Sequence, residues 1–125
     1  MIIGVGTDLV EIPRLESVIH RRGSRLLNRL FTPDEQQYCE DKARPATHYA
    51  ARFAAKEACV KALGTGLSRG IKWLEVEVCR DDEGKPSIVL TGLAREIAAN
   101  LAVRDIHLSL THTKDYASAV VVLEG

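Results

Sequence analysis

The sequence has few cysteines, and none lies close to another along the chain. The 125 residues include three, Cys39, Cys59 and Cys79, and no two of them form a Cys-x-x-Cys pair. An odd, scattered set of this kind is not typical of a disulfide framework or a zinc knuckle. It fits a protein of the reducing cytosol, where disulfides are rare.

Long apolar runs and an excess of one charge are absent as well. The N-terminus reaches Asp8 without the apolar run of a signal peptide, and no segment approaches the roughly 20 apolar residues of a membrane span. Lys plus Arg and Asp plus Glu both number 17, which gives no reason to propose bulk binding to nucleic acid. We therefore expect one cytoplasmic domain, residues 1–125, that binds neither nucleic acid nor a membrane.

Several familiar catalytic signatures are missing too. The phosphate-binding loop Gly-x-x-x-x-Gly-Lys-Ser/Thr does not occur, nor does the zinc motif His-Glu-x-x-His. The nucleophile elbow Gly-x-Ser-x-Gly is also absent. Any catalysis must use a different set of residues.

The most informative stretch that is present runs from Arg52 to Gly66 and predicts a helix. It is rich in Ala, Leu, Lys and Glu, and Gly64 and Gly66 stand where a left-handed C-terminal cap is expected. Three of the four positions one turn from Glu57 are apolar, so its carboxylate is expected to face the interior or a cleft. The spacing leaves open an ordinary helical ion pair between Glu57 and Lys61.

The first ten residues alternate as in a β-strand. One face is expected to carry Ile2, Gly4, Gly6, Asp8 and Val10, and the other Ile3, Val5, Thr7 and Leu9. A carboxylate beyond two glycines predicts that another backbone or a ligand comes close to this face. The alternative is that Asp8 only ends the strand and caps the next turn.

A basic helix is predicted over residues 13–29, with Gly23 weakening its middle. Arg14, Arg21 and Arg25 lie seven and four residues apart, which places them in a stripe on one face. Such a stripe is either a solvated face or a docking site for an acidic partner. No aromatic residues are interleaved with it, which argues against single-stranded nucleic acid as that partner.

The rest of the chain completes an α+β pattern. The patterns predict a capped helix at 33–41, strands at 71–79 and 87–90, a helix at 92–101 capped by Thr91, and strands at 106–111 and 117–123. His107, Ser109 and Thr111 share one strand face, which is either simply exposed or able to hydrogen-bond a phosphate. We expect a mainly antiparallel sheet packed with the long central helix.

Asp8 and Glu57 are the two carboxylates expected to point inward. Mg²⁺ typically takes one or two protein carboxylates and completes its shell with water and substrate phosphates. Lys61 would place a cation near such phosphates, and the Gly64-Thr65-Gly66 loop could bring backbone N–H groups to an anion. Metal-assisted chemistry on a diphosphate is the interpretation that uses all of these residues.

Three motifs in this order resemble the holo-acyl-carrier-protein synthases, which are small 4′-phosphopantetheinyl transferases. They are Gly-Val-Gly-Thr-Asp-Leu-Val from Gly4, Arg-Phe-Ala-Ala-Lys-Glu-Ala-x-x-Lys-Ala-Leu-Gly-Thr-Gly from Arg52, and His-Leu-Ser-Leu-Thr-His-Thr from His107. The resemblance runs the length of the chain and includes Phe-Thr-Pro-Asp-Glu from Phe31 and Gly-Lys-Pro from Gly84.

The resemblance implies transfer of phosphopantetheine from coenzyme A to a serine of acyl carrier protein, with release of adenosine 3′,5′-bisphosphate, in fatty acid biosynthesis. It implies that Asp8 and Glu57 bind Mg²⁺ and that Lys61 lies near the diphosphate. His107 matches a histidine at the nucleotide end of coenzyme A, with Ser109 and Thr111 on the phosphate side of the same strand.

Further expectations follow from the same resemblance. Arg14, Arg21 and Arg25 would dock the acidic carrier protein, and the protein would be a homotrimer with the coenzyme site at subunit contacts. This chain departs from the family at Glu83, where an asparagine is common, and an acidic group there would repel a 3′-phosphate. Two other functions remain open: a non-catalytic module that docks an acidic protein, and another Mg²⁺-dependent phosphoryl enzyme that needs no carrier.

Overall fold

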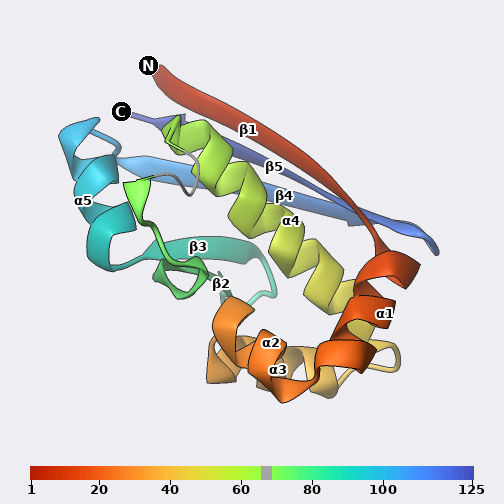
Figure 1. Ribbon diagram of the computed structural model, residues 1–125. Coiled ribbons are helices and arrows are strands. Elements are labelled where there is room, and N and C mark those ends of the chain that lie inside the picture. The colour runs from red at the N-terminus through yellow and green to blue at the C-terminus, as the bar shows by residue number, and fades with distance from the viewer. Residues whose placement is uncertain (66–68) are drawn as a thin grey trace.

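The computed structural model describes residues 1–65 and 69–125 (Figure 1). In chain order the elements are β1 (Ile2–Glu11), α1 (Ile12–Arg22), α2 (Ser24–Leu30), α3 (Pro33–Glu40), α4 (Pro45–Leu63), the 3₁₀ turn η2 (Trp73–Glu75), β2 (Val76–Arg80), β3 (Pro86–Leu90), α5 (Gly92–Asn100), β4 (Asp105–His112) and β5 (Tyr116–Glu124). Gly66 was predicted to belong to the cap of the central helix, and it lies outside the described residues.

The strands form two antiparallel sheets, which confirms the predicted α+β class. One sheet has the order β1-β5-β4, so that β5 pairs with both β1 and β4, and the other is the β2–β3 hairpin. Both predicted hairpins are therefore present. In the part of the chain that the structure describes, no helix is long and apolar enough to cross a membrane.

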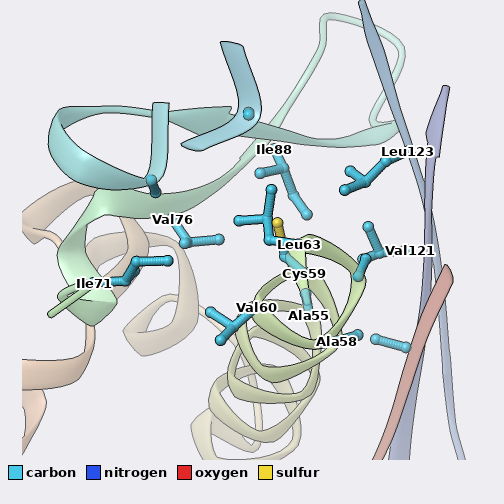
Figure 2. Close-up of a cluster of buried hydrophobic side chains, with 14 of the residues drawn as sticks. Ala55, Ala58, Cys59, Val60, Leu63, Ile71, Val76, Ile88, Val121 and Leu123 are labelled. Atoms are coloured by element: carbon cyan, nitrogen blue, oxygen red, sulfur yellow. The ribbon is translucent and has the colours of Figure 1, made fainter. Parts of the chain in front are cut away.

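Helix α4 lies across one face of the three-stranded sheet and forms the centre of the molecule (Figure 1). Half of its buried residues are alanines, which let strands approach the helix closely. In Figure 2, Leu63 and Cys59 of α4 lie between Ile88 of the hairpin and Val121 and Leu123 of β5. The core is thus a helix held between two sheets.

A buried ion pair fastens α3 to the other side of α4. Lys56 Nζ lies 2.8 Å from Glu35 Oε1, and both side chains are fully buried. Lys56 also donates to the carbonyl oxygens of Trp73 and Val76, while the N–H of Val78 donates to Glu35 Oε2. The predicted capping box is confirmed: Glu35 accepts from the backbone N–H of Thr32, whose hydroxyl accepts from the N–H of Glu35.

The basic helix is divided, and β1 contains an irregularity. Gly23 adopts φ 67° and separates α1 from α2, so the two helices do not present one continuous face. The pairing of β1 with β5 shifts register between Ile2 and Gly4, and Ile3 packs against the core while Ile2 is exposed. The predicted faces of these two isoleucines were therefore exchanged.

The strand predicted at 71–79 begins only at Val76. Residues 73–75 form the turn η2, in which Glu75 accepts from the backbone N–H groups of Lys72 and Leu93. The second contact also caps α5, a role predicted for the side chain of Thr91, which makes no capping hydrogen bond. Because the turn is held in this way, Leu74 is exposed rather than buried on the strand face.

Candidate active site

Two glycines of β1 bring this strand unusually close to helix α4. A Cβ atom at Gly4 would overlap the carbonyl oxygen of Ala62, and one at Gly6 would overlap the carbonyl oxygen of Ala58. Only glycine fits where two backbones are this close. The prediction of a close approach on this strand face is confirmed, and its cause is the helix backbone. Asp8, two residues beyond Gly6 on the same face, is thereby placed beside the helix.

Asp8, Lys61 and Glu57 come together at this contact. Lys61 Nζ lies 3.0 Å from Asp8 Oδ1 and also donates to the carbonyl oxygen of Thr7 at 3.0 Å. Among the described residues, then, Lys61 pairs with Asp8 rather than with Glu57 in a simple helical pair. Asp8 does not serve only as a strand-end cap.

The electrostatics of Glu57 reflect this arrangement. Burial raises the pKa of its carboxyl group, and the nearby negative charge of Asp8 raises it further, while Lys61 lowers it. A carboxylate whose pKa is raised by a second carboxylate beside it favours a cation near the two groups. The ammonium group of Lys61 already balances part of this negative charge.

A groove of about 370 Å³ leads away from the two carboxylates. We call it the carboxylate groove; it is lined by Asp8, Leu9, Val10, Glu11, Arg14, Leu15, Val18, Phe53 and Glu57. Five of these nine lining residues are apolar, and Arg14 is the one cation among the nine. A flexible, largely uncharged chain or the side chains of a partner protein would fit such a surface.

The donor set of this groove suits Mg²⁺. Asp8 and Glu57 supply only oxygen, from a strand and a helix that face each other. Mg²⁺ is usually bound in this way, by one or two carboxylates with water and substrate phosphates. Within residues 1–65 and 69–125, no group of three or more His, Cys, Asp or Glu side chains forms a denser metal site.

His107, Ser109 and Thr111 lie elsewhere in the same chain. They are exposed, whereas the alternate residues of β4 pack against the core, so the three face away from α4. Asp8 lies on the opposite face of this sheet, next to α4. A single chain therefore does not bring the two predicted groups together.

His107 borders a second hollow, of about 260 Å³, between β4 and the start of β3. The hollow is lined by Asp81, Lys85, Pro86, Ser87, Ile106, His107 and Leu108. His107 Nε2 lies 2.9 Å from Glu124 Oε1, and this hydrogen bond lowers the pKa of Glu124. Glu83 is in the adjoining turn, where its backbone N–H donates to Asp81.

The end of α4 behaves as predicted for the residues that are described. Gly64 adopts the left-handed conformation, with φ 77°, and ends the helix. Gly64 and Thr65 border a hollow of about 210 Å³ that Arg69 and Asn100 also line. This loop directly follows Lys61 and the last turn of the helix.

The three predicted docking arginines are distributed over two surfaces. Arg14 lines the carboxylate groove, whereas Arg25 lines a hollow of about 720 Å³ together with Arg22, Leu26 and Arg29. Arg21 is exposed in the last turn of α1. The break at Gly23 is the reason that the spacing of seven and four does not produce one stripe.

Sequence reasoning missed a group of cations around Tyr38. The guanidinium carbon of Arg52 lies 3.9 Å from the centre of the Tyr38 ring, Lys42 Nζ lies at 4.4 Å, and the guanidinium carbon of Arg80 at 5.1 Å. Arg52 is buried, and its Nε and Nη1 atoms have no hydrogen-bond partner among the described residues. Because three cations meet at one ring, this surface suits an anionic group. Lys42 is only four residues from Tyr38, but Arg52 and Arg80 come from other elements, so no local pattern indicates the whole group.

Comparisons with known proteins agree with this geometry. The family model described as the 4′-phosphopantetheinyl transferase superfamily matches residues 4–121. A holo-[acyl-carrier-protein] synthase of Koribacter versatilis is 48% identical over 124 residues, which is 99% of each chain.

Solved structures give the same result. The crystal structure of holo-[acyl-carrier-protein] synthase from Neisseria meningitidis is similar with a TM-score of 0.89 and 32% identity, covering 100% of both chains. The Helicobacter pylori holo-[acyl-carrier-protein] synthase, solved in complex with coenzyme A, has a TM-score of 0.84 and 31% identity, covering 96% of this chain and 99% of that one. The chain therefore belongs to the holo-[acyl-carrier-protein] synthases of the 4′-phosphopantetheinyl transferase superfamily.

Proposed function

We propose that this protein transfers 4′-phosphopantetheine from coenzyme A to a serine of apo acyl carrier protein and releases adenosine 3′,5′-bisphosphate. The observation that carries the proposal is the meeting of Asp8, Glu57 and Lys61 at the head of the carboxylate groove. Two carboxylates and one ammonium are the groups that a diphosphate with its cation requires. The chain's relatives include a synthase solved with coenzyme A.

In the proposed reaction, the serine oxygen forms a bond to the phosphorus next to pantetheine, and the bond from that phosphorus to the leaving bisphosphate breaks. Asp8 and Glu57 would hold Mg²⁺, which would neutralise part of the charge on the diphosphate. Glu57, a carboxylate that lines the groove, receives the proton that the serine hydroxyl loses. Lys61 stabilises the negative charge on the leaving bisphosphate.

The nucleotide end of coenzyme A needs a second set of residues. His107, Ser109 and Thr111 face away from α4, and the cations around Tyr38 add a positive surface. Because His107, Ser109 and Thr111 lie on the opposite face of the sheet from Asp8, we propose that one chain supplies the carboxylates and a second chain the nucleotide contacts. The loop at Gly64 and Thr65 would lie beside the diphosphate.

The outer face of the three-stranded sheet is the surface on which copies would meet. It carries exposed apolar side chains: Val5 is 55% exposed, Leu9 64% and Val120 40%. Apolar patches on a sheet face commonly mark protein interfaces. A closed ring such as the homotrimer would bury this face in every copy. We expect that assembly in the cytoplasm, with Arg14, Arg21 and Arg25 left to dock the acidic carrier.

The experiment that tests the function is a loading reaction. Purified protein is incubated with coenzyme A, Mg²⁺ and an apo acyl carrier protein, and the carrier is weighed by mass spectrometry. We expect a gain of one phosphopantetheine group that requires Mg²⁺ and disappears in Asp8→Ala. No gain with several carriers, while coenzyme A still binds, would contradict the proposal and favour a docking module without catalysis.

A further inference from the structure

A groove between α2 and the turn η2 has no role in the chemistry described above. It measures about 470 Å³, and we call it the Trp73 groove; it is lined by Arg29, Ile71, Lys72, Trp73 and Leu74. Two cations and three apolar residues line it, with no acidic side chain among them. Leu74 is 41% exposed, which leaves apolar surface available at the edge of the groove.

The position of Leu74 is fixed by the chain around it. Glu75 accepts hydrogen bonds from the backbone N–H groups of Lys72 and Leu93, so η2 is tied at both ends. Lys56 contributes a third bond, to the carbonyl oxygen of Trp73. A turn held this firmly presents Leu74 and Lys72 in one arrangement, and a partner pays little ordering cost on binding them.

The Trp73 groove is continuous with the arginine surface of α2. Arg29 lines both this groove and the 720 Å³ hollow that contains Arg22, Arg25 and Leu26. Four cations, Arg22, Arg25, Arg29 and Lys72, thus border two adjoining hollows whose lining includes no carboxylate. Such a surface is complementary to an acidic partner that also carries apolar side chains.

The Trp73 groove is also linked to the catalytic carboxylates. The ring of Trp73 packs against that of Phe53, with the ring centres 5.2 Å apart. Phe53 in turn lines the carboxylate groove beside Glu57. A protein bound along α2 could therefore reach the Trp73 groove while one of its residues lies at Glu57.

We propose that the acidic carrier protein docks beyond the arginines, onto Lys72 and Leu74 in the Trp73 groove. The inference rests on the proposed function, since it concerns how the same carrier is bound. A carboxylate of the carrier pairs with Lys72 and Arg29, and an apolar carrier side chain covers Leu74. The groove contributes to recognition of the carrier and takes no part in binding coenzyme A.

The test uses Lys72→Glu and Leu74→Ser, whose side chains are exposed, so the fold should persist; thermal unfolding verifies this. Steady-state loading gives a separate KM for carrier and for coenzyme A. Direct binding is measured with a carrier whose acceptor serine is replaced by alanine, so that no turnover occurs. The matched controls are Arg95→Glu, another exposed cation, on α5, and Val89→Ser, another exposed apolar residue, on β3.

We expect Lys72→Glu to raise the KM and the Kd for carrier about tenfold, because charge reversal replaces attraction by repulsion. Leu74→Ser should raise both about threefold to tenfold through the lost apolar contact. The kcat, the KM for coenzyme A and both control variants should stay at the wild-type values. The effect of Lys72→Glu should shrink at high salt.

Three outcomes would overturn the inference. Wild-type KM and Kd for carrier in both variants would show that the groove does not touch the carrier. A changed KM for coenzyme A would place the pantetheine arm there instead, and an altered oligomeric state would identify a second copy as the occupant. If the wild-type protein loads no carrier, the proposed function fails. The binding measurement with the carrier that lacks the acceptor serine still decides whether the Trp73 groove binds the carrier.

Discussion

Lys61 of α4 and Asp8 of β1 form an ion pair with 3.0 Å between Nζ and Oδ1, and this pair lies beside Glu57. It joins the helix and the strand that the two glycines of β1 hold together. Lys61 is half exposed, whereas Asp8 is mostly covered. The pair is therefore more important for arranging charge in the site than for holding the fold, since exposed ion pairs contribute little stability.

Replacing Asp8 by Asn should separate these two roles. The variant keeps the size of the side chain but loses the charge that the cation and Lys61 require. We expect the loading rate to fall about 100-fold or more, which corresponds to about 3 kcal/mol of lost charge stabilisation. The free energy of unfolding should change by less than about 1 kcal/mol. Asp105→Asn, an exposed aspartate on β4, is the control; a normal rate in Asp8→Asn would refute the role.

Glu57→Gln should stop turnover and yet stabilise the protein at neutral pH. The folded-state pKa of Glu57 is raised above its ordinary value of 4.5. The stability linked to this group is therefore fully present below pH 4.5 and is lost as pH rises through the folded-state pKa. Glutamine avoids that loss, so the variant should melt above wild type at pH 7.

The check is thermal unfolding of both proteins between about pH 4 and pH 8 without divalent cations. The gap in melting temperature should close as the pH falls. Added Mg²⁺ should raise the melting temperature of wild type and leave that of the variant unchanged. A gap that is independent of pH, or near wild-type turnover in the variant, would be inconsistent with the proposed role of Glu57.

Gly6→Ala tests whether the close approach of β1 and α4 organises the site. The added methyl group would overlap the carbonyl oxygen of Ala58, so the strand must move away from the helix. We expect a loss of about 1–3 kcal/mol in stability and a much larger fractional loss of loading at 25 °C. The control is Val78→Ala, a buried change in β2 of similar cost. If the two variants load carrier equally well, the approach is structural only.

Val120→Lys tests the proposed assembly. The charge is placed on the exposed outer face of the three-stranded sheet, and folding of the single chain should survive. Light scattering should then show a smaller particle, and loading should fall because the nucleotide contacts come from another copy. Val89→Lys makes the same change at an exposed valine of β3 and should alter neither property. A trimer that persists in Val120→Lys would place the contact between copies elsewhere.

The sequence was most informative where structure depends on neighbours along the chain. The capping box at Thr32, the C-terminal cap at Gly64 and both hairpins depend on residues a few positions apart, and all four were predicted. Glu57 and Asp8, which were expected to face the interior or a cleft, both line the carboxylate groove, because helix and strand periodicity gives the side on which a side chain lies. Local patterns thus identified most of the carboxylate site.

Features set by distant parts of the chain were missed. The pairing of β1 with β5, the burial of Lys56 against Glu35 and the cations around Tyr38 all join segments that are separated in sequence. Leu74 was placed in a strand because its alternation with Val76 is local, whereas the turn that exposes it depends on Glu75 reaching α5. The alternation of residues within this one segment cannot indicate a contact with α5.

The pairing of β1 with β5 also determines the order in which parts of the molecule can fold. During synthesis Asp8 leaves the ribosome early, but among the described strands only β5 pairs with β1, so this pairing waits until residues 116–124 have emerged. Helix α4 and the β2–β3 hairpin can form before then. The carboxylate of Asp8 therefore reaches its final place opposite Glu57 at the last stage of folding, so a nascent chain that lacks β5 should have no competent site.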